Sequence, residues 1–346
     1  MILCRGVAVG LIFGLLVASA PPVDAQGGLA LWPTGSTASS TCRGYSGGVG
    51  GGPFSKVIKG YDYPHAADSA AEFIDGNVRL MNATAAGRSN DSALAARLLT
   101  AAQGDAFTRL DFETPGGASP SFLTGTLITN VAFSVAALRA NGALSADQMS
   151  VIDTWVRKLI KNTPVKFNNK AVDHRAILAS SKLAWGAAIG DATLYGQGLK
   201  ALTTALKGLN SGAVFADDVR HNNEAFHHIM IGAAIAYRNG TDVFSAKIGR
   251  VTLHQATAFH AAWVVSNGTA KVRTSGEPNG AAQNIFRAQG FAANVAWVPI
   301  YLSLFPNSGA ATEVRALDKV LRRQDGAPFW GLVEGIHSGC LFGRGS

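Results

Sequence analysis

Cysteine is scarce in this chain, which has three among its 346 residues. Neither a CxxC pair nor a spaced set of cysteines and histidines occurs, which argues against a structural zinc site. Cys4 lies in the apolar N-terminal segment, so Cys42 and Cys340 remain near the two ends of the mature chain. In an oxidising compartment we expect these two to form one disulfide, and two unpaired thiols are the alternative.

Long apolar runs are also lacking, apart from the one at residues 7–17. This run follows a positive charge and leads to the small residues at 23–25, a pattern typical of a cleaved signal peptide. It is shorter than the roughly 18–20 residues of a membrane span, and we expect no later run to reach that length. Residues 1–25 are therefore expected to be a signal peptide of a periplasmic or secreted protein that does not bind a membrane after cleavage. An uncleaved anchor helix is the alternative.

Long runs of consecutive basic residues are absent, although the 30 lysines and arginines outnumber the 22 aspartates and glutamates. Five or six consecutive basic residues would be typical of a nucleic-acid-binding segment, so we expect no nucleic acid as partner. A positively charged surface attracts other polyanions and speeds their encounter. Together with export, the charge favours an anionic polysaccharide.

Strand patterns are scarce as well, and beyond the first 65 residues the dominant apolar period is helical. A capping box at 145–148 precedes a helix that stops at Pro164. Another helix is expected to begin at Asn222 or Asn223 and to end at 239–240. Further helices are expected at 66–86, 91–102, 122–141, 171–190, 193–208, 243–266, 279–304 and 309–324.

The first part of the mature chain is rich in Gly, Ser, Thr and Pro and cannot bury enough apolar surface to form a core element. We expect residues 26–65 to form a surface arm whose one fixed point is Cys42. Residues 66–346 show no internal linker and are expected to form a single domain and a monomer. Helices that recur every 20 to 50 residues are typical of a curved helical array that carries its function on loops.

Three polar segments hold most of the eight histidines. Segment 167–175 contains Asn168, Asn169, Asp173, His174 and Arg175; segment 217–228 contains Arg220, Asn222, His227 and His228; segment 59–65 contains Tyr61 and Tyr63. No HxxxH or HExxH pattern occurs, so we expect no metal ion and no other cofactor.

These residue types suit β-elimination from a uronate within a polymer. Loss of the C5 proton pushes charge onto the C6 carboxylate, which amides and an arginine can neutralise. A base must take the proton, and an acid must protonate the leaving glycosidic oxygen. Each residue also has an ordinary structural interpretation, such as a helix cap or a surface ion pair. Because His227 and His228 project about 100° apart on a helix, at most one of them faces a given cavity.

The order and separation of these segments resemble the family 5 alginate lyases and related glucuronan lyases. The stretch at 172–174, Val-Asp-His, resembles the Asn-Asn-His motif that opens a family helix, and Gly-Asp at 190–191 resembles the turn that follows. Arg220 falls where the family has an arginine, and Phe-His-His at 226–228 falls where it has His-Tyr-His. The similarity covers roughly residues 120–306.

This resemblance implies an all-α fold, an incomplete (α/α) toroid or barrel with a long substrate cleft or tunnel. It also implies a polysaccharide lyase that cleaves alginate or glucuronan by β-elimination. His174 and Arg220 would take the family's catalytic positions, and Asn169 would neutralise the carboxylate. His227 replaces the family tyrosine and becomes the expected proton donor, unless a tyrosine of the arm does this work. The remaining polar residues of the three segments are expected to bind substrate: Asn168, Asp173, Arg175, Asn222, His228, Tyr61 and Tyr63.

Two other functions remain open. A glycoside hydrolase on a helical toroid would need two carboxyl groups about 5–10 Å apart. Asp173 could provide one of them, and Asp217, Asp218 or Glu224 the other. A non-catalytic protein that binds acidic polysaccharides would show affinity without turnover.

Overall fold

The computed structural model describes residues 49–59, 68–85, 90–112, 120–163, 172–209, 212–215, 219–266, 295–324 and 335–342. This part of the chain is mainly helical, which confirms the all-α class. Its two short strands, β1 (Val57–Ile58) and β2 (Arg109–Leu110), pair in parallel.

Eleven helices are described along the chain. Their bounds are α1 (Ala70–Ala85), α2 (Asp91–Gln103), α3 (Pro120–Ala140), α4 (Ala146–Asn162), α5 (Val172–Ile189), α6 (Ala192–Leu206), α7 (Val219–Arg238), α8 (Leu253–Val265), α10 (Trp297–Leu304), α11 (Ala311–Gln324) and α12 (Ser338–Leu341).

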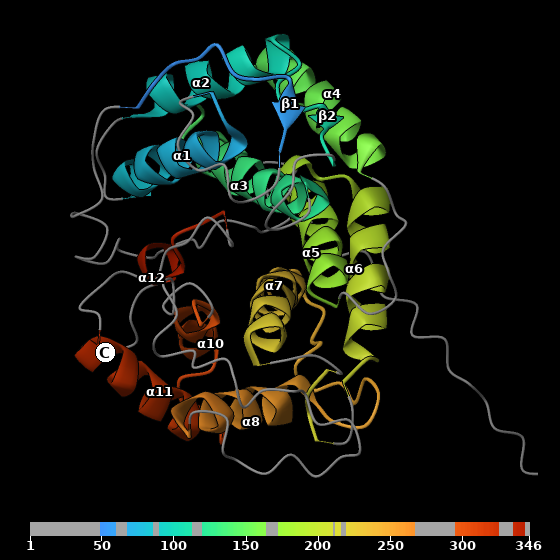
Figure 1. Cartoon of the computed structure of the whole chain (residues 1–346), viewed down its shortest axis with the longest axis vertical. Helices are drawn as coiled ribbons and strands as arrows, with labels where there is room; N and C mark the ends of the chain where they lie inside the picture. The colour runs from blue at the N-terminus through green and yellow to red at the C-terminus, as the bar shows by residue number, and fades with distance from the viewer. Residues whose placement is uncertain are drawn as a thin grey trace, which may run out of the picture.

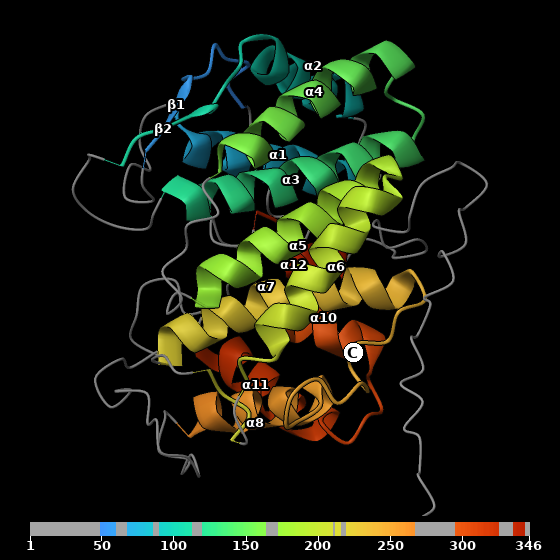
Figure 2. The same cartoon turned by 90° about the vertical axis from the view of Figure 1, so that its right-hand side faces the viewer.

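Together the helices form a two-layered arc (Figure 1). The inner layer contains α1, α3, α5, α7 and α10, and the outer layer contains α2, α4, α6, α8 and α11. Helix α5 packs against α3, α6 and α7, so it lies at the middle of the arc. Seen from the side, the layers run from α2 and α4 at one end to α8 and α11 at the other (Figure 2). This arrangement is the incomplete α/α toroid.

The last described segment, residues 335–342, joins the two ends of the arc. Its helix α12 contacts both α1 and α10. Ser338 Oγ donates a hydrogen bond to the Ala296 carbonyl (2.6 Å), and Asn130 Nδ2 donates one to the Gly335 carbonyl (2.7 Å). Gly335 has a φ of +70°, and a Cβ there would lie 2.6 Å from the Thr126 carbonyl oxygen, so the turn requires glycine.

Cys340 lies in this segment and is disulfide-bonded. Its partner is outside the described residues, and so is Cys42. The pairing of these two cysteines therefore stays a prediction.

The helix boundaries agree with the sequence patterns at several ends. Gln148 N donates to Ser145 Oγ (3.2 Å) and Ser145 N donates to Gln148 Oε1 (2.9 Å), which confirms the capping box. Gly240 follows α7 with a φ of +82°, as a glycine that ends a helix does.

Two expected helix starts were wrong. Helix α7 begins at Val219, one turn before Asn222 and Asn223. Residues 243–252 form turns rather than the first half of a helix, because Thr252 caps α8 in a second capping box with Gln255. Within the expected helix at 279–304, the described part is helical from Trp297.

The arm is attached to the domain at more than one point. Phe107 N donates to the Ser55 carbonyl (2.9 Å), and Arg109 N donates to the Lys56 carbonyl (3.0 Å). The Phe54 ring lies 4.8 Å from the ring of Phe73. The expectation that Cys42 alone fixes the arm is therefore wrong, because the end of the arm pairs as β1.

Helix α3 has the length and composition of a membrane-spanning helix, which the sequence analysis did not expect. Of its most apolar window, 94% is buried inside the protein. It packs against α1 and α5. A helix that is apolar on all sides and covered by neighbours is typical of the core of a large domain.

Candidate active site

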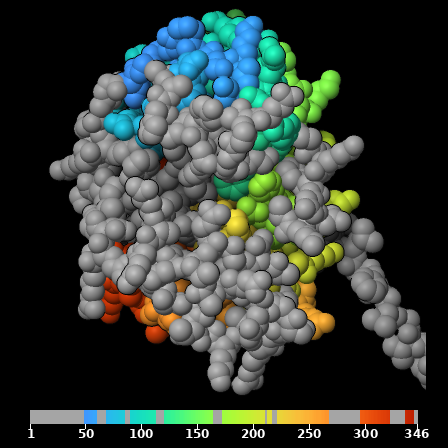
Figure 3. All heavy atoms as spheres, viewed as in Figure 1, coloured from blue at the N-terminus to red at the C-terminus, as the bar shows by residue number. Residues whose placement is uncertain are grey.

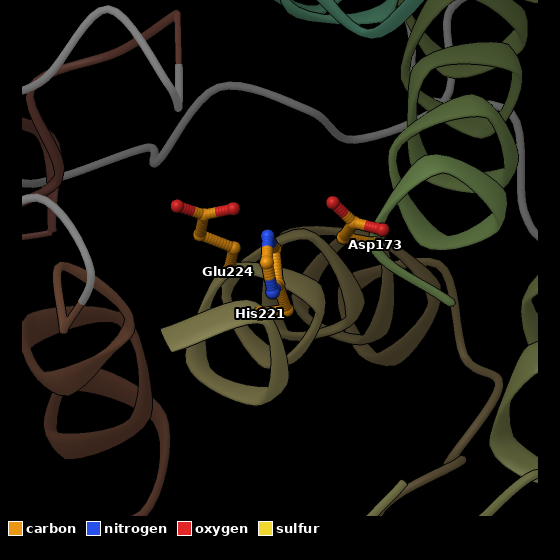
Figure 4. A group of neighbouring side chains, drawn as sticks. All are labelled: Asp173, His221 and Glu224. Atoms are coloured by element: carbon orange, nitrogen blue, oxygen red, sulfur yellow. The ribbon is translucent and has the colours of Figure 1, made fainter. Parts of the chain in front are cut away.

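The first turn of α5 and the first two turns of α7 bring three ionisable side chains together. Asp173 belongs to α5, whereas His221 and Glu224 belong to α7, and one possible ligand atom of each lies within 4.8 Å of the other two. The spacing of three residues places His221 and Glu224 on one face of their helix. All three side chains point into the same space beside the two helices (Figure 4).

This Asp173–His221–Glu224 cluster is largely enclosed. Asp173 is 6% exposed, Glu224 is 8% exposed, and His221 is half-buried. In the space-filling view, atoms of α5 and α7 are visible at the centre of the face between the two ends of the arc (Figure 3). Both helices that carry the cluster therefore reach the molecular surface on this face.

His174 lies beside this cluster and is half-buried. Its Nε2 is 3.9 Å from Asp173 Oδ2, and its ring centroid is 5.5 Å from that of Phe122. The nitrogen–oxygen distance is too long for a hydrogen bond but short enough for an ion pair when the imidazole is protonated. His174 thus combines partial exposure with a neighbouring carboxylate.

His227 and His228 occupy a different environment, because both are 0% exposed. None of their ring nitrogens has a hydrogen-bond partner among the described residues. Burial, with the charge of His174 as the second cause, lowers the pKa of His228 to about 3. Burial also lowers the pKa of His227 well below its usual value, with the charge of His228 as the second cause.

These properties do not support the roles that the sequence suggested for the pair. A proton donor must reach the leaving oxygen and carry a proton near neutral pH. His227 is enclosed and its pKa is lowered, so its assignment as proton donor stays a prediction without support from its surroundings. His228 is equally enclosed, with its ring 5.4 Å from that of Phe122, so it supports His174 from the core rather than binding substrate.

Asn222 also has a structural role in place of the expected substrate contact. It is 0% exposed. Its Oδ1 accepts a hydrogen bond from Phe215 N (2.8 Å), and its Nδ2 donates one to the Phe215 carbonyl (3.3 Å). The neighbouring Asn223 Oδ1 accepts from Trp297 Nε1 (3.4 Å). The two amides therefore hold the preceding segment and α10 against α7.

Arg175 lies on the opposite side of α5 from Asp173. Two residues along a helix correspond to a rotation of about 200°. Arg175 lines a pocket of about 460 Å³ near α6 together with Lys182 and Lys200. Its expected contact with the substrate beside Asp173 is therefore not supported.

The other predicted site residues stay predictions. Arg220 lies in the first turn of α7, directly before His221. The remaining four lie outside the described residues: Tyr61, Tyr63, Asn168 and Asn169.

The sequence analysis did not assign His221 to the site, and it considered Glu224 only for a hydrolase. It also excluded a metal site from the lack of closely spaced histidines, whereas the cluster draws its ligand atoms from two helices. The available signal was the three-residue spacing of His221 and Glu224. Asp173 was expected to bind substrate and was paired with Glu224 for the hydrolase alternative, but no local pattern joins it to His221, because the two lie on different helices about fifty residues apart.

Comparison with known proteins identifies the fold. No family model matches the chain, and no curated protein sequence does. The alginate lyase A1-III from Sphingomonas species A1 superposes with a TM-score of 0.64 and 15% identity, over 92% of this chain and 90% of that one. A Tyr→Phe variant of A1-III complexed with a tetrasaccharide gives a TM-score of 0.66 and 17% identity, over 90% of this chain and 88% of that one. An alginate lyase from Bacteroides ovatus gives a TM-score of 0.52 and 11% identity, over 79% of this chain and 73% of that one. The chain therefore has the fold of these alginate lyases.

Proposed function

We propose that this protein is a polysaccharide lyase that cleaves a uronate-containing acidic polysaccharide, alginate or glucuronan, by β-elimination. The observation that carries the proposal is the position of His174, an accessible imidazole beside Asp173 on the inner layer of an alginate-lyase fold. In A1-III, the same fold was solved with a tetrasaccharide in a His→Ala variant and in a Tyr→Phe variant. Those complexes support an oligosaccharide as the kind of molecule that this fold holds.

His174 is the group that moves protons in the proposed reaction. Its neutral imidazole takes the C5 proton of the uronate, and the electron pair of the C–H bond forms the C4–C5 double bond. The C4–O4 bond breaks, and the leaving oxygen takes a proton from the imidazolium or from water. The product carries a 4,5-unsaturated uronate end. The Asp173 carboxylate, 3.9 Å from Nε2, stabilises the imidazolium that forms in the first step.

The C6 carboxylate gains charge as the C5 proton leaves, so it needs a positive partner. Arg220 is the proposed partner, because its planar guanidinium can donate two parallel hydrogen bonds to a carboxylate. The chain as a whole has a formal net charge of +8, which favours the encounter with a polyanion. Export to the periplasm or the medium belongs to the same proposal, since such polymers lie outside the cytoplasm.

A retaining glycoside hydrolase is the second candidate, and one observation favours it. The carboxylate oxygens of Asp173 and Glu224 lie within 4.8 Å of each other. Retaining glycosidases hold their two carboxyl groups about 5–5.5 Å apart. The two candidates differ in their products, because a hydrolase adds water and leaves no double bond.

One experiment separates the candidates. The mature protein is incubated with polymannuronate, polyguluronate, glucuronan and hyaluronan, while near-ultraviolet absorbance and reducing ends are measured together. A lyase raises both signals in proportion. A hydrolase raises only the reducing ends, and a binding protein raises neither.

The variant His174→Ala tests the assignment within the lyase. We expect its turnover to fall by roughly 10²–10⁴-fold. The matched control is His254→Gln on α8, whose Nδ1 lies 2.7 Å from the hydroxyl of Tyr301, outside the site. This control should retain turnover, and an equally active His174→Ala would refute the assignment.

A further inference from the structure

We propose that Asp173, His221 and Glu224 bind one divalent transition-metal ion of the Mn²⁺ or Zn²⁺ type. We further propose that an open coordination position of this ion binds the substrate carboxylate, and this second part rests on the proposed function.

The geometry of the cluster is close to that of a three-ligand site. Ligand atoms about 2.1 Å from an ion are at most about 4.2 Å apart. The three possible ligand atoms lie within 4.8 Å of one another, so they must approach by about 0.6 Å to reach this limit and by about 1.4 Å to reach the tetrahedral separation of about 3.4 Å. Rotation of the carboxylate side chains provides such a movement. The backbone needs no change, because α5 and α7 pack directly against each other.

The burial of the Asp173 carboxylate calls for a compensating positive charge. Asp173 and Glu224 are 6% and 8% exposed, and like charges repel strongly where water is excluded. Within the described part of the chain, the Asp173 carboxylate makes no hydrogen bond, and its contact with His174 measures 3.9 Å. A buried carboxylate normally has hydrogen-bond donors or a cation. Asp173 points into the cluster, which is where a cation would supply that compensation (Figure 4).

The ligand types narrow the choice of ion. Two carboxylates and one imidazole, without a thiolate, suit Mn²⁺ and Zn²⁺. Three protein ligands leave at least one coordination position open, as in catalytic zinc sites. An ion in this position would neutralise a uronate carboxylate as the C5 proton leaves. It would also allow that carboxylate to lie beside Asp173 and Glu224, which would otherwise repel it.

The binding test uses the mature protein without a histidine tag, first dialysed against a chelator. Titration calorimetry with Mn²⁺ and with Zn²⁺ should show one site per chain. Asp173→Asn and Glu224→Gln should each weaken that site tenfold or more. The matched control is Asp242→Asn, an aspartate whose charge acts on His254, away from the cluster; it should bind as the unchanged protein does.

Circular dichroism and a thermal-unfolding curve show whether each variant folds. Stabilisation of the unchanged protein by the ion gives a second measure of binding that needs no variant. Absence of a stoichiometric site overturns the proposal, and so does a folded Glu224→Gln that binds with full affinity.

Activity after removal of the metal separates this inference from the proposed function. Loss of uronan cleavage in the chelator, restored by Mn²⁺ or Zn²⁺, supports both. Metal binding with unchanged cleavage after its removal overturns the contact between ion and substrate. Metal binding without cleavage of any uronan overturns the proposed function alone, and cleavage without a metal site overturns the inference alone.

Discussion

Three buried histidines should make the fold lose stability below about pH 6.5. His227, His228 and His260 are all 0% exposed. Burial lowers the pKa of His228 and of His260 to about 3, and it lowers the pKa of His227 well below its usual value. In the unfolded chain a histidine has a pKa near 6.5, so below this pH the unfolded state binds protons that the folded state does not.

The sign and size of the effect follow from this difference. Because the folded-state pKa is lowered, the stabilisation is fully present above pH 6.5 and is lost as the pH falls from 6.5 toward 3. Each such histidine contributes a slope of about 1.4 kcal/mol per pH unit in that window. Between pH 7 and pH 5.5 the free energy of unfolding therefore falls by about 1.3 kcal/mol for each histidine and by about 4 kcal/mol for all three. The free energy of unfolding of a typical domain is only about 5–15 kcal/mol in total.

Urea unfolding followed by circular dichroism at pH 7.5, 6.5 and 5.5 measures the free energy of unfolding directly. His228→Gln and His260→Gln should each reduce the pH slope by about a third. His260→Gln also loses the stacking on Phe226 at 4.2 Å and the hydrogen bond to the Ala213 carbonyl, so its absolute stability falls at every pH. The slope, not the absolute value, is therefore the decisive quantity. Equal stability at pH 7.5 and 5.5, or variants with an unchanged slope, would refute the reasoning.

Three further changes have expected outcomes. Arg220→Lys keeps the charge but loses the planar fork, so uronan turnover should fall about tenfold or more; unchanged kinetics would remove Arg220 from the site. Reduction of the disulfide at Cys340 should lower the free energy of unfolding by a few kcal/mol, which a lower unfolding temperature would show. Mass spectrometry without reductant should find that Cys340 does not react with an alkylating reagent. Asn130→Ala removes three buried hydrogen bonds, one from Asn77, one to the Ile74 carbonyl and one to the C-terminal segment, and should cost about 2–4 kcal/mol in urea unfolding. The exposed amide of Asn141 provides its control, since Asn141→Ala should change stability by less than about 0.5 kcal/mol.

Local patterns in the sequence were sufficient for most of the helices. The capping box at Ser145 and the glycine after α7 are signals contained within a few residues, and the structure confirms both. The start of α7 was harder, because two asparagines that look like helix caps belong to its second turn. The amide of Asn222 turns back to bond the backbone of Phe215, a contact that depends on the path of the chain before the helix.

The candidate site was less predictable, because its members are chosen by packing between helices. His174 was proposed for the site because Val-Asp-His at 172–174 resembles a family motif. The burial of His227 could not, because it depends on which face of α7 meets α5 and α10. The same rotation that encloses His227 turns His221 and Glu224 toward Asp173. A sequence motif fixes only the spacing of residues, whereas the rotation of the helix decides which of them face the open side.

The orientation of α7 about its axis links two positions, 173 and 227, at which this chain differs from the alginate-lyase pattern. The pattern places an asparagine where this chain has Asp173 and a tyrosine where it has His227. With His227 enclosed, proton transfer in the proposed reaction falls to His174, which is accessible and has a carboxylate 3.9 Å away. With a carboxylate at 173, charge neutralisation cannot come from an amide there, and Asp173 instead joins His221 and Glu224. Both departures thus have one consequence in the proposed reaction: the chemistry moves from His227, in the third turn of α7, to His174 at the start of α5 and to the cluster that Asp173 forms with the first two turns of α7.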